Sequence, residues 1–235
     1  MKKKVLIVVA NPSIHPTLNY PVGFWASELF HPITVFQKEG ISYDIVSPEG
    51  GKVILDPMSD PNDESGYSAW DQVSKQFIDE GFMTTLESTT SISDINEADY
   101  DAIMVAGGQS PMFTFEDATQ LHKTFETFYN QGKVASALCH GVSVLNYVKD
   151  SEGNDLATGK TVTGFTNEEE DAANAAVGTE VMPWRIEDAL LAKNANFKKA
   201  EAWHPFAVAD GNLVTGQQNM SGEVTAQKIV ELLNA

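Results

Sequence analysis

Short runs of β-branched residues alternate with segments of helical periodicity in the first half of the chain. Residues 5–9 form an apolar run between lysines and an Asn-Pro pair, which predicts a strand buried on both faces. After Pro21, apolar residues at helical spacing predict a helix that ends at Gly40: Phe24, Trp25, Leu29, Ile33 and Phe36. Residues 43–47 alternate before Pro48 and predict the next strand.

The same alternation continues through the middle of the chain. Residues 101–106 and 134–138 predict two further buried strands, each followed by a glycine-containing turn. Between them Leu121, Phe125 and Phe128 share one helical face, and that helix ends at Gly132. The order strand, helix, strand, helix, strand indicates the α/β class, with a mostly parallel central sheet, right-handed crossovers and helices on both faces.

The rest of the chain adds elements to the same unit. Residues 161–165 predict a strand. Glu168 to Asp171 are expected to begin a helix, because acidic side chains are stabilised by the partial positive charge at a helix N-terminus. Pro183-Trp184 begins a further predicted helix. Residues 207–209 and 213–215 predict a hairpin, and Ser221 is expected to cap a final helix through Leu233. Residues 56–66 are interpreted as an acidic loop rather than a linker, so residues 1–235 are expected to form one domain.

Composition excludes several classes of partner. Thirty-three acidic and fifteen basic residues give a formal charge of −18, which repels nucleic acids and anionic membrane surfaces. The apolar run after the basic start is too short for a signal peptide, and no stretch approaches the ~18–20 apolar residues of a membrane span. A cytoplasmic protein is therefore expected. The single cysteine cannot form an intrachain disulfide, so its thiol needs another explanation.

That cysteine stands where a buried strand is expected to end. In Ala137-Leu138-Cys139-His140-Gly141, small residues flank the cysteine as in a nucleophile elbow, which lifts a side chain to the carboxyl edge of the sheet. A helix beginning just after Cys139 would favour the thiolate, and the His140 amide would face a developing oxyanion. The alternative is a buried structural cysteine, which composition alone favours equally.

Two further groups are candidates for the same site. Gly107-Gly108 ends the neighbouring strand, so the Gly108 amide could supply a second oxyanion donor; an ordinary strand-to-loop turn is the alternative. Glu28 lies among apolar and aromatic residues of the first helix, where burial would raise its proton affinity and suit an acid or base; a solvated helix residue is the alternative. The histidines have no metal-ligand spacing, so neither a metal nor another cofactor is expected.

These residues together resemble the ThiJ/PfpI superfamily, also described as class I glutamine amidotransferase-like, over nearly the whole chain. Within it the chain is most similar to the heat-shock chaperone branch with glutathione-independent glyoxalase activity. The resemblance rests on residues 4–8, 28–32, 40–48, 106–108, 137–141, 164–170 and 210–216.

The resemblance implies a flavodoxin-like three-layer sandwich, a homodimer and roles for particular residues. Cys139 would be the nucleophile beside His140, Glu28 would exchange protons with it, and Glu170 would orient His140, with Glu168 and Glu169 as fallback candidates. Substrate would contact Gly107, Gln109 and Trp203, although Trp203 also suits simple packing around the pocket. The sequence departs from the branch at Gln109-Ser110, where His-Gly is usual, and at Val142, where proline is usual.

Three functions follow as hypotheses. The first is a Cys139-dependent glyoxalase III-type lyase, or a related deglycase, that converts methylglyoxal or glyoxal into a 2-hydroxy acid. The second is a cysteine hydrolase of small amides or peptides that uses the same elbow. The third is a stress-response chaperone or redox sensor in which Cys139 is oxidised rather than turned over.

Overall fold

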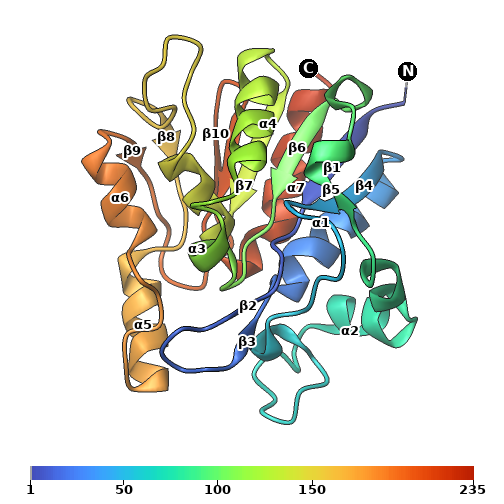
Figure 1. The fold of residues 1–235 in the computed structure, drawn as a ribbon, viewed down its shortest axis with the longest axis vertical. Coiled ribbons are helices and arrows are strands. Elements are labelled where there is room, and N and C mark those ends of the chain that lie inside the picture. The colour runs from blue at the N-terminus through green and yellow to red at the C-terminus, as the bar shows by residue number, and fades with distance from the viewer. Residues whose placement is uncertain (1) are drawn as a thin grey trace.

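A seven-stranded β-sheet runs through the centre of the computed structural model, which describes residues 2–235 (Figure 1). Its strands are β1 (Lys4–Val8), β4 (Ser42–Ser47), β5 (Thr90–Ser91), β6 (Ala102–Val105), β7 (Val134–Leu138), β10 (Ala207–Asp210) and β11 (Leu213–Gly216). The strand order is β10-β11-β7-β6-β1-β4-β5; the β10–β11 hairpin is antiparallel and the other neighbouring pairs are parallel. The expected α/β class and mostly parallel sheet are confirmed.

Helices cover both faces of this sheet. Helices α1 (Ala26–Lys38) and α7 (Gly222–Leu233) lie on one face, and α4 (Thr119–Asn130) and the 3-10 helix Cys139–Asn146 lie on the other (Figure 1). Alternate residues of β1 enter the two cores, Leu6 on the α4 side and Ile7 on the α1 side. The central strands are therefore continuous apolar runs because both of their faces are buried. The predicted three-layer arrangement is confirmed.

Smaller elements surround the sheet. They are β2 (Ser13–Ile14), β3 (Pro21–Val22), α2 (Gln72–Asp79), α3 (Pro111–Thr114), β8 (Thr161–Val162), α5 (Asn167–Val177), α6 (Ile186–Ala192) and β9 (Asn196–Phe197), with 3-10 helices at Pro57–Ser59, Phe82–Leu86, Ile92–Asp94, Glu97–Asp99 and Asn219–Ser221. Strands β2 and β3 form a hairpin, and α2 packs on α1. Within residues 2–235, no helix is both long enough and apolar enough to cross a bilayer.

The strand expected over residues 161–165 is shorter than predicted. Only Thr161–Val162 is extended, and it pairs with β9 in a separate two-stranded sheet rather than joining the central sheet. Gly164 packs so closely on the 3-10 helix that a Cβ there would lie 3.0 Å from the Val142 side chain. The chain then enters the N-cap of α5 at Thr166, so the strand cannot continue.

One local expectation is wrong. Ser221 stands at the N-cap position of α7, but its hydroxyl does not cap that helix and instead accepts hydrogen bonds from the Phe206 and Gln218 amides. Residues 56–66 form a loop around the 3-10 helix Pro57–Ser59, but the Asp56 side chain at its start is fully buried. That burial brings Asp56 to the candidate site.

Candidate active site

Cys139 occupies a sharp corner at the carboxyl end of β7. Its φ is +54°, in the left-handed region that residues with a Cβ rarely adopt, and its side chain is only 2 % exposed. Two residues later, a Cβ on Gly141 would lie 2.7 Å from the carbonyl oxygens of Val105 and Ala106. The close approach of β6 therefore requires glycine at that position, and the corner has the geometry of a nucleophile elbow.

Glu28 lies behind this corner, on the first turn of α1. Its carboxyl group is fully buried, and its Oε2 accepts a hydrogen bond of 2.6 Å from the Gly107 amide. Its Oε1 has no hydrogen bond among residues 2–235, and the carboxyl group and the Cys139 thiol influence each other's pKa. Because α1 follows β1, and β1 and β7 both pair with β6, the topology brings these distant residues to one edge of the sheet.

Burial controls the protonation of this pair. Burial raises the pKa of the Glu28 carboxyl to about 8, so this group holds a proton at neutral pH. Burial and the neighbouring Glu28 also raise the pKa of the Cys139 thiol. The expectation that the following helix favours the thiolate is therefore wrong. That helix is a 3-10 helix, and the loss of solvent around the sulfur outweighs the attraction of its N-terminus.

His140 connects the corner to helix α5. Its Nδ1 lies 3.9 Å from the Cys139 sulfur, and its Nε2 lies 2.9 Å from Oε1 of the buried Glu170 carboxylate. The ring also packs against Phe165 at a centroid distance of 4.2 Å. A carboxylate at Nε2 favours the tautomer that carries its proton there, which leaves Nδ1 free to accept a proton on the sulfur side.

The neighbouring glutamates of α5 have other environments. Glu168 is exposed to solvent. Glu169 forms a capping box with Thr166 and accepts hydrogen bonds from the Trp203 amide at 3.0 Å and the Gln217 side chain at 2.9 Å. Of the three candidates, the structure therefore brings only Glu170 into contact with His140. Glu169 instead connects the start of α5 to the segment that carries Trp203.

The two glycines after β6 are placed by packing. A Cβ on Gly107 would lie 2.7 Å from Glu28 Oε2, and a Cβ on Gly108, whose φ is +97°, would lie 2.5 Å from the Gly23 carbonyl oxygen. Of the described residues, neither of these two is among those that line the cavity at Cys139. The Gly107 amide donates to Glu28, and the contact of Gly107 with substrate stays a prediction. The role of the Gly108 and His140 amides at an oxyanion stays a prediction.

Gln109 belongs to a buried polar network that the sequence did not reveal. Its Nε2 donates to Asp56 Oδ1 at 3.0 Å, and its Oε1 accepts from the Tyr20 hydroxyl at 2.6 Å. The Gln109 amide also lies 3.3 Å from Asp56 Oδ2. Burial raises the pKa of Asp56 to about 6. In the sequence, the apolar residues just before Asp56 were the only signal that this acid enters the core, and Tyr20 had none.

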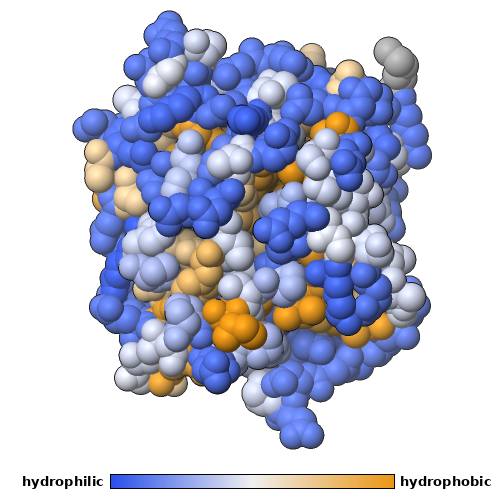
Figure 2. All heavy atoms as spheres, in the orientation of Figure 1, coloured by the Kyte–Doolittle hydropathy of each residue, from blue (hydrophilic) through white to orange (hydrophobic). Residues whose placement is uncertain are grey.

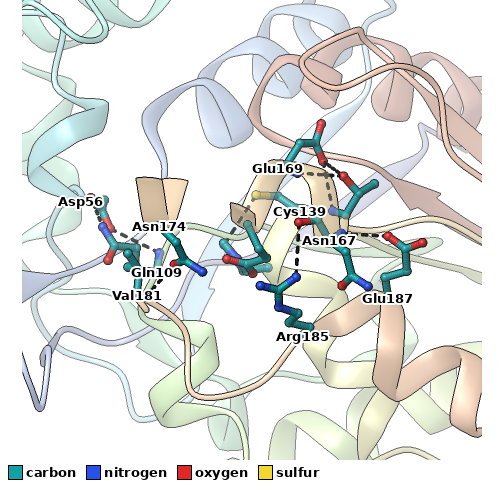
Figure 3. A network of polar contacts seen from close by, with 12 residues as sticks. Asp56, Gln109, Cys139, Asn167, Glu169, Asn174, Val181, Arg185 and Glu187 are labelled. Carbon is teal, nitrogen blue, oxygen red and sulfur yellow. Dashed lines mark hydrogen bonds and ion pairs between the residues drawn. The ribbon is translucent and has the colours of Figure 1, made fainter. Parts of the chain in front are cut away.

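Several of these residues line a cavity of about 100 Å³ that reaches the Cys139 thiol. Figure 3 shows Cys139 between the Asp56–Gln109 pair on one side and the Asn167–Glu187 contact on the other. Gln109, His140, Glu170 and Trp203 line the cavity together with Cys139. The other lining groups, apart from Asn219, are aromatic or aliphatic: Tyr20, Trp25, Met58, Tyr67, Phe165, Ala172, Ala173, Ala176, Val177, Val181 and Met182. Within residues 2–235, no three metal-ligating side chains form a cluster.

Known proteins resemble this chain over almost its whole length. A glutathione-independent glyoxalase from Schizosaccharomyces pombe, hsp3102, is 32% identical, covering 99% of this chain and 98% of its own. The crystal structure of glyoxalase III from Candida albicans superposes with a TM-score of 0.81 and 26% identity, over 98% of this chain and 97% of that one. The X-ray structure of the Rapid Encystment Protein of 24 kDa from Francisella tularensis superposes with a TM-score of 0.87 and 31% identity, over 98% of this chain and 99% of that one. A profile of the DJ-1/PfpI family matches residues 19–232, and the chain belongs to this family.

Proposed function

We propose that this protein is a glutathione-independent glyoxalase that converts small 2-oxoaldehydes into 2-hydroxy acids at Cys139. One observation carries the proposal. The thiol lies near two buried carboxyl groups of different character: Glu28, whose carboxyl affects the thiol pKa, and Glu170, which is hydrogen-bonded to His140. A reaction that adds a thiol to a carbonyl and then moves a proton between adjacent carbons needs a nucleophile with a proton carrier beside it.

The chemistry uses each group in turn. The reactive form is the one in which the Cys139–Glu28 pair has lost one proton. In this form the Glu28 carboxylate accepts the thiol proton, the sulfur adds to the aldehyde carbon, and Glu28 passes the proton to the aldehyde oxygen, which gives a hemithioacetal. Glu28 then removes the proton on that carbon and returns it to the adjacent carbon through an enediol, which leaves a 2-hydroxy thioester on Cys139. Water, activated by His140, hydrolyses the thioester to the 2-hydroxy acid and frees the thiol. The net change is the uptake of one water and needs no glutathione.

Two alternative functions use the same cysteine. An amide hydrolase has no need for a protonated carboxyl group buried behind its nucleophile, yet Glu28 occupies that position. A redox sensor needs an accessible thiolate, whereas Cys139 is 2 % exposed and its thiol pKa is raised by burial. Both observations favour turnover of an oxoaldehyde.

The deciding experiment measures lactate formed from methylglyoxal in the absence of glutathione. Wild type should produce lactate, Cys139→Ala should produce none, and Glu28→Gln should be slower by roughly 10²–10⁴-fold. Unchanged turnover in either variant would reject the assignment. Release of ammonia from small amides, at a rate above that of lactate formation, would support the hydrolase instead.

The proposal includes a cytoplasmic, single-domain homodimer that binds no nucleic acid. Its formal charge of −18 supports the last point, because like charges repel a phosphate backbone. Sedimentation equilibrium at micromolar concentration tests the dimer, and a purely monomeric species would contradict it.

A further inference from the structure

The wall of the cavity formed by α5 is longer than a methylglyoxal molecule needs. Glu170, at the start of this wall, contacts His140 beside the thiol, and the lining continues through Ala173 and Ala176 to Val177. At 1.5 Å per residue, the helix from Glu170 to Val177 spans about 10 Å. A methyl substituent is one carbon long, so most of this wall would have no contact with it.

The chemistry of the wall is apolar along this length. Alanines on α5 leave room beside the helix, while Val181 and Met182 follow it, and Trp25, Met58 and Tyr67 contribute from other segments. Val177 at the far end is 40% exposed, so the lining leads from the buried thiol toward the surface. Figure 2 shows apolar surface in the lower middle of the face, over the β2–β3 hairpin of Figure 1.

Charge in the cavity restricts the ligand further. Among the described residues, no lysine or arginine lines the cavity, and its one carboxylate, Glu170, is hydrogen-bonded to His140. The polar amide of Gln109 is also engaged, since it donates to Asp56 and accepts from Tyr20. A substituent that carries a carboxylate or phosphate would find no lysine or arginine along the wall.

We propose that the preferred substrate is a neutral 2-oxoaldehyde with an aryl group or an alkyl chain of several carbons, which lies along the Ala173–Val177 face of α5. This inference rests on the proposed function and adds the substrate class. Its carbonyl carbons would lie at the thiol, and its apolar group would extend toward Val177. Each apolar carbon buried there strengthens binding, so the wall should select against the methyl compound.

The test compares kcat/KM for phenylglyoxal, methylglyoxal and glyoxylate. Wild type should favour phenylglyoxal over methylglyoxal by about tenfold or more, and glyoxylate should be the poorest of the three. Ala173→Leu places a side chain in the cavity and should lower the phenylglyoxal to methylglyoxal ratio about tenfold. Ala175→Leu makes the same change on the same helix, at an exposed position outside the cavity lining, and should leave the ratio unchanged.

A wild-type ratio of one or less would overturn the proposal, as would equal effects of the two leucine variants. A second measurement separates this failure from failure of the glyoxalase assignment. In Cys139→Ala, tryptophan fluorescence should report binding of acetophenone more tightly than acetone, because Trp25 and Trp203 line the cavity. A protein that turns over no oxoaldehyde could still bind acetophenone more tightly than acetone. If Ala173→Leu then removes that difference in affinity, the apolar binding site is supported and only the glyoxalase assignment fails. If acetophenone and acetone bind equally, the apolar site is rejected.

Discussion

His140 and Glu170 form a buried pair in which Nε2 of the ring lies 2.9 Å from Oε1 of the carboxylate. The pair joins the corner after β7 to helix α5, thirty residues further along the chain. It fixes the ring with Nδ1 directed toward the sulfur. We therefore expect the carboxylate to act by positioning the histidine.

Glu170→Gln should lower kcat by roughly tenfold or more, because the amide no longer favours the tautomer with Nδ1 unprotonated. KM should change less, since the cavity keeps its shape. Steady-state kinetics with methylglyoxal measure both constants. Glu168→Gln is the matched control, because Glu168 is exposed on the same helix and should leave kcat as in wild type. Equal losses in the two variants would remove the positioning role of Glu170.

The rate should depend on pH through Glu28. Because burial raises the pKa of this carboxyl to about 8, wild-type kcat/KM should rise with pH and level off above about 8, as the Cys139–Glu28 pair loses its first proton. In Glu28→Gln the thiol must ionise without this partner, so the rise should move to higher pH. A pH-rate profile of the two proteins checks the shift, and superimposable profiles would show that another group controls the rate.

Gly107 should be intolerant of a methyl group for a steric reason. An alanine Cβ would lie 2.7 Å from Glu28 Oε2 and 2.8 Å from the amides of His140 and Gly141. Gly107→Ala should therefore displace Glu28, lose most activity and destabilise the fold by about 1–3 kcal/mol.

Gly178→Ala provides the comparison for that variant. Gly178 ends α5 with φ +83° and has open space around it, so alanine there should cost about 1 kcal/mol of backbone strain and leave kcat/KM unchanged. Urea denaturation and kinetics of both variants distinguish loss of stability from loss of the site. Full activity in Gly107→Ala would mean that Glu28 can move without consequence.

Asp56 should make the fold less stable as pH rises from about 4 to about 6. Burial raises its pKa from 3.8 to about 6, so the native state holds a proton that the unfolded chain has released. The contribution of Asp56 to the free energy of unfolding is fully present below its pKa in the unfolded chain. It is lost as the pH rises through its pKa in the folded protein.

Asp56→Asn removes this pH dependence. Relative to wild type, its free energy of unfolding should therefore rise by up to about 3 kcal/mol between pH 4 and pH 7, because a difference of one pKa unit between the folded and unfolded states corresponds to about 1.4 kcal/mol. Urea titrations at the two pH values measure this difference. Glu64→Gln makes the same carboxylate-to-amide change at an exposed position of the same segment and should show a much smaller change. A flat difference for Asp56→Asn would mean that the carboxyl is not desolvated.

The central strands and the corner were predictable because their causes are local. An apolar run such as residues 5–9 reports burial on both faces, and the small residues around Cys139 report a sharp turn. The spacing that selected Glu170 depended on the family resemblance, and the contact with His140 is confirmed by the geometry.

The missed features depend on contacts between distant segments. The composition of residues 56–66 indicates a loop, and only the packing of Gln109, 53 residues away, shows that Asp56 is buried. The protonation of Cys139 was mispredicted for a related reason. A helix N-terminus is visible in the sequence, whereas the desolvation that raises the thiol pKa arises from the whole surrounding fold.

The left-handed backbone at residue 139 has a cost that every side chain there must bear. For a residue with a Cβ, that conformation is unfavourable by about 1–2 kcal/mol, and glycine alone escapes it. Cys139→Gly should thus resist denaturant better than Cys139→Ala, although both are inert. Glycine, the residue with the least backbone strain at this position, has no side chain that can react. Stability of the fold and reactivity of the site therefore favour different residues at position 139.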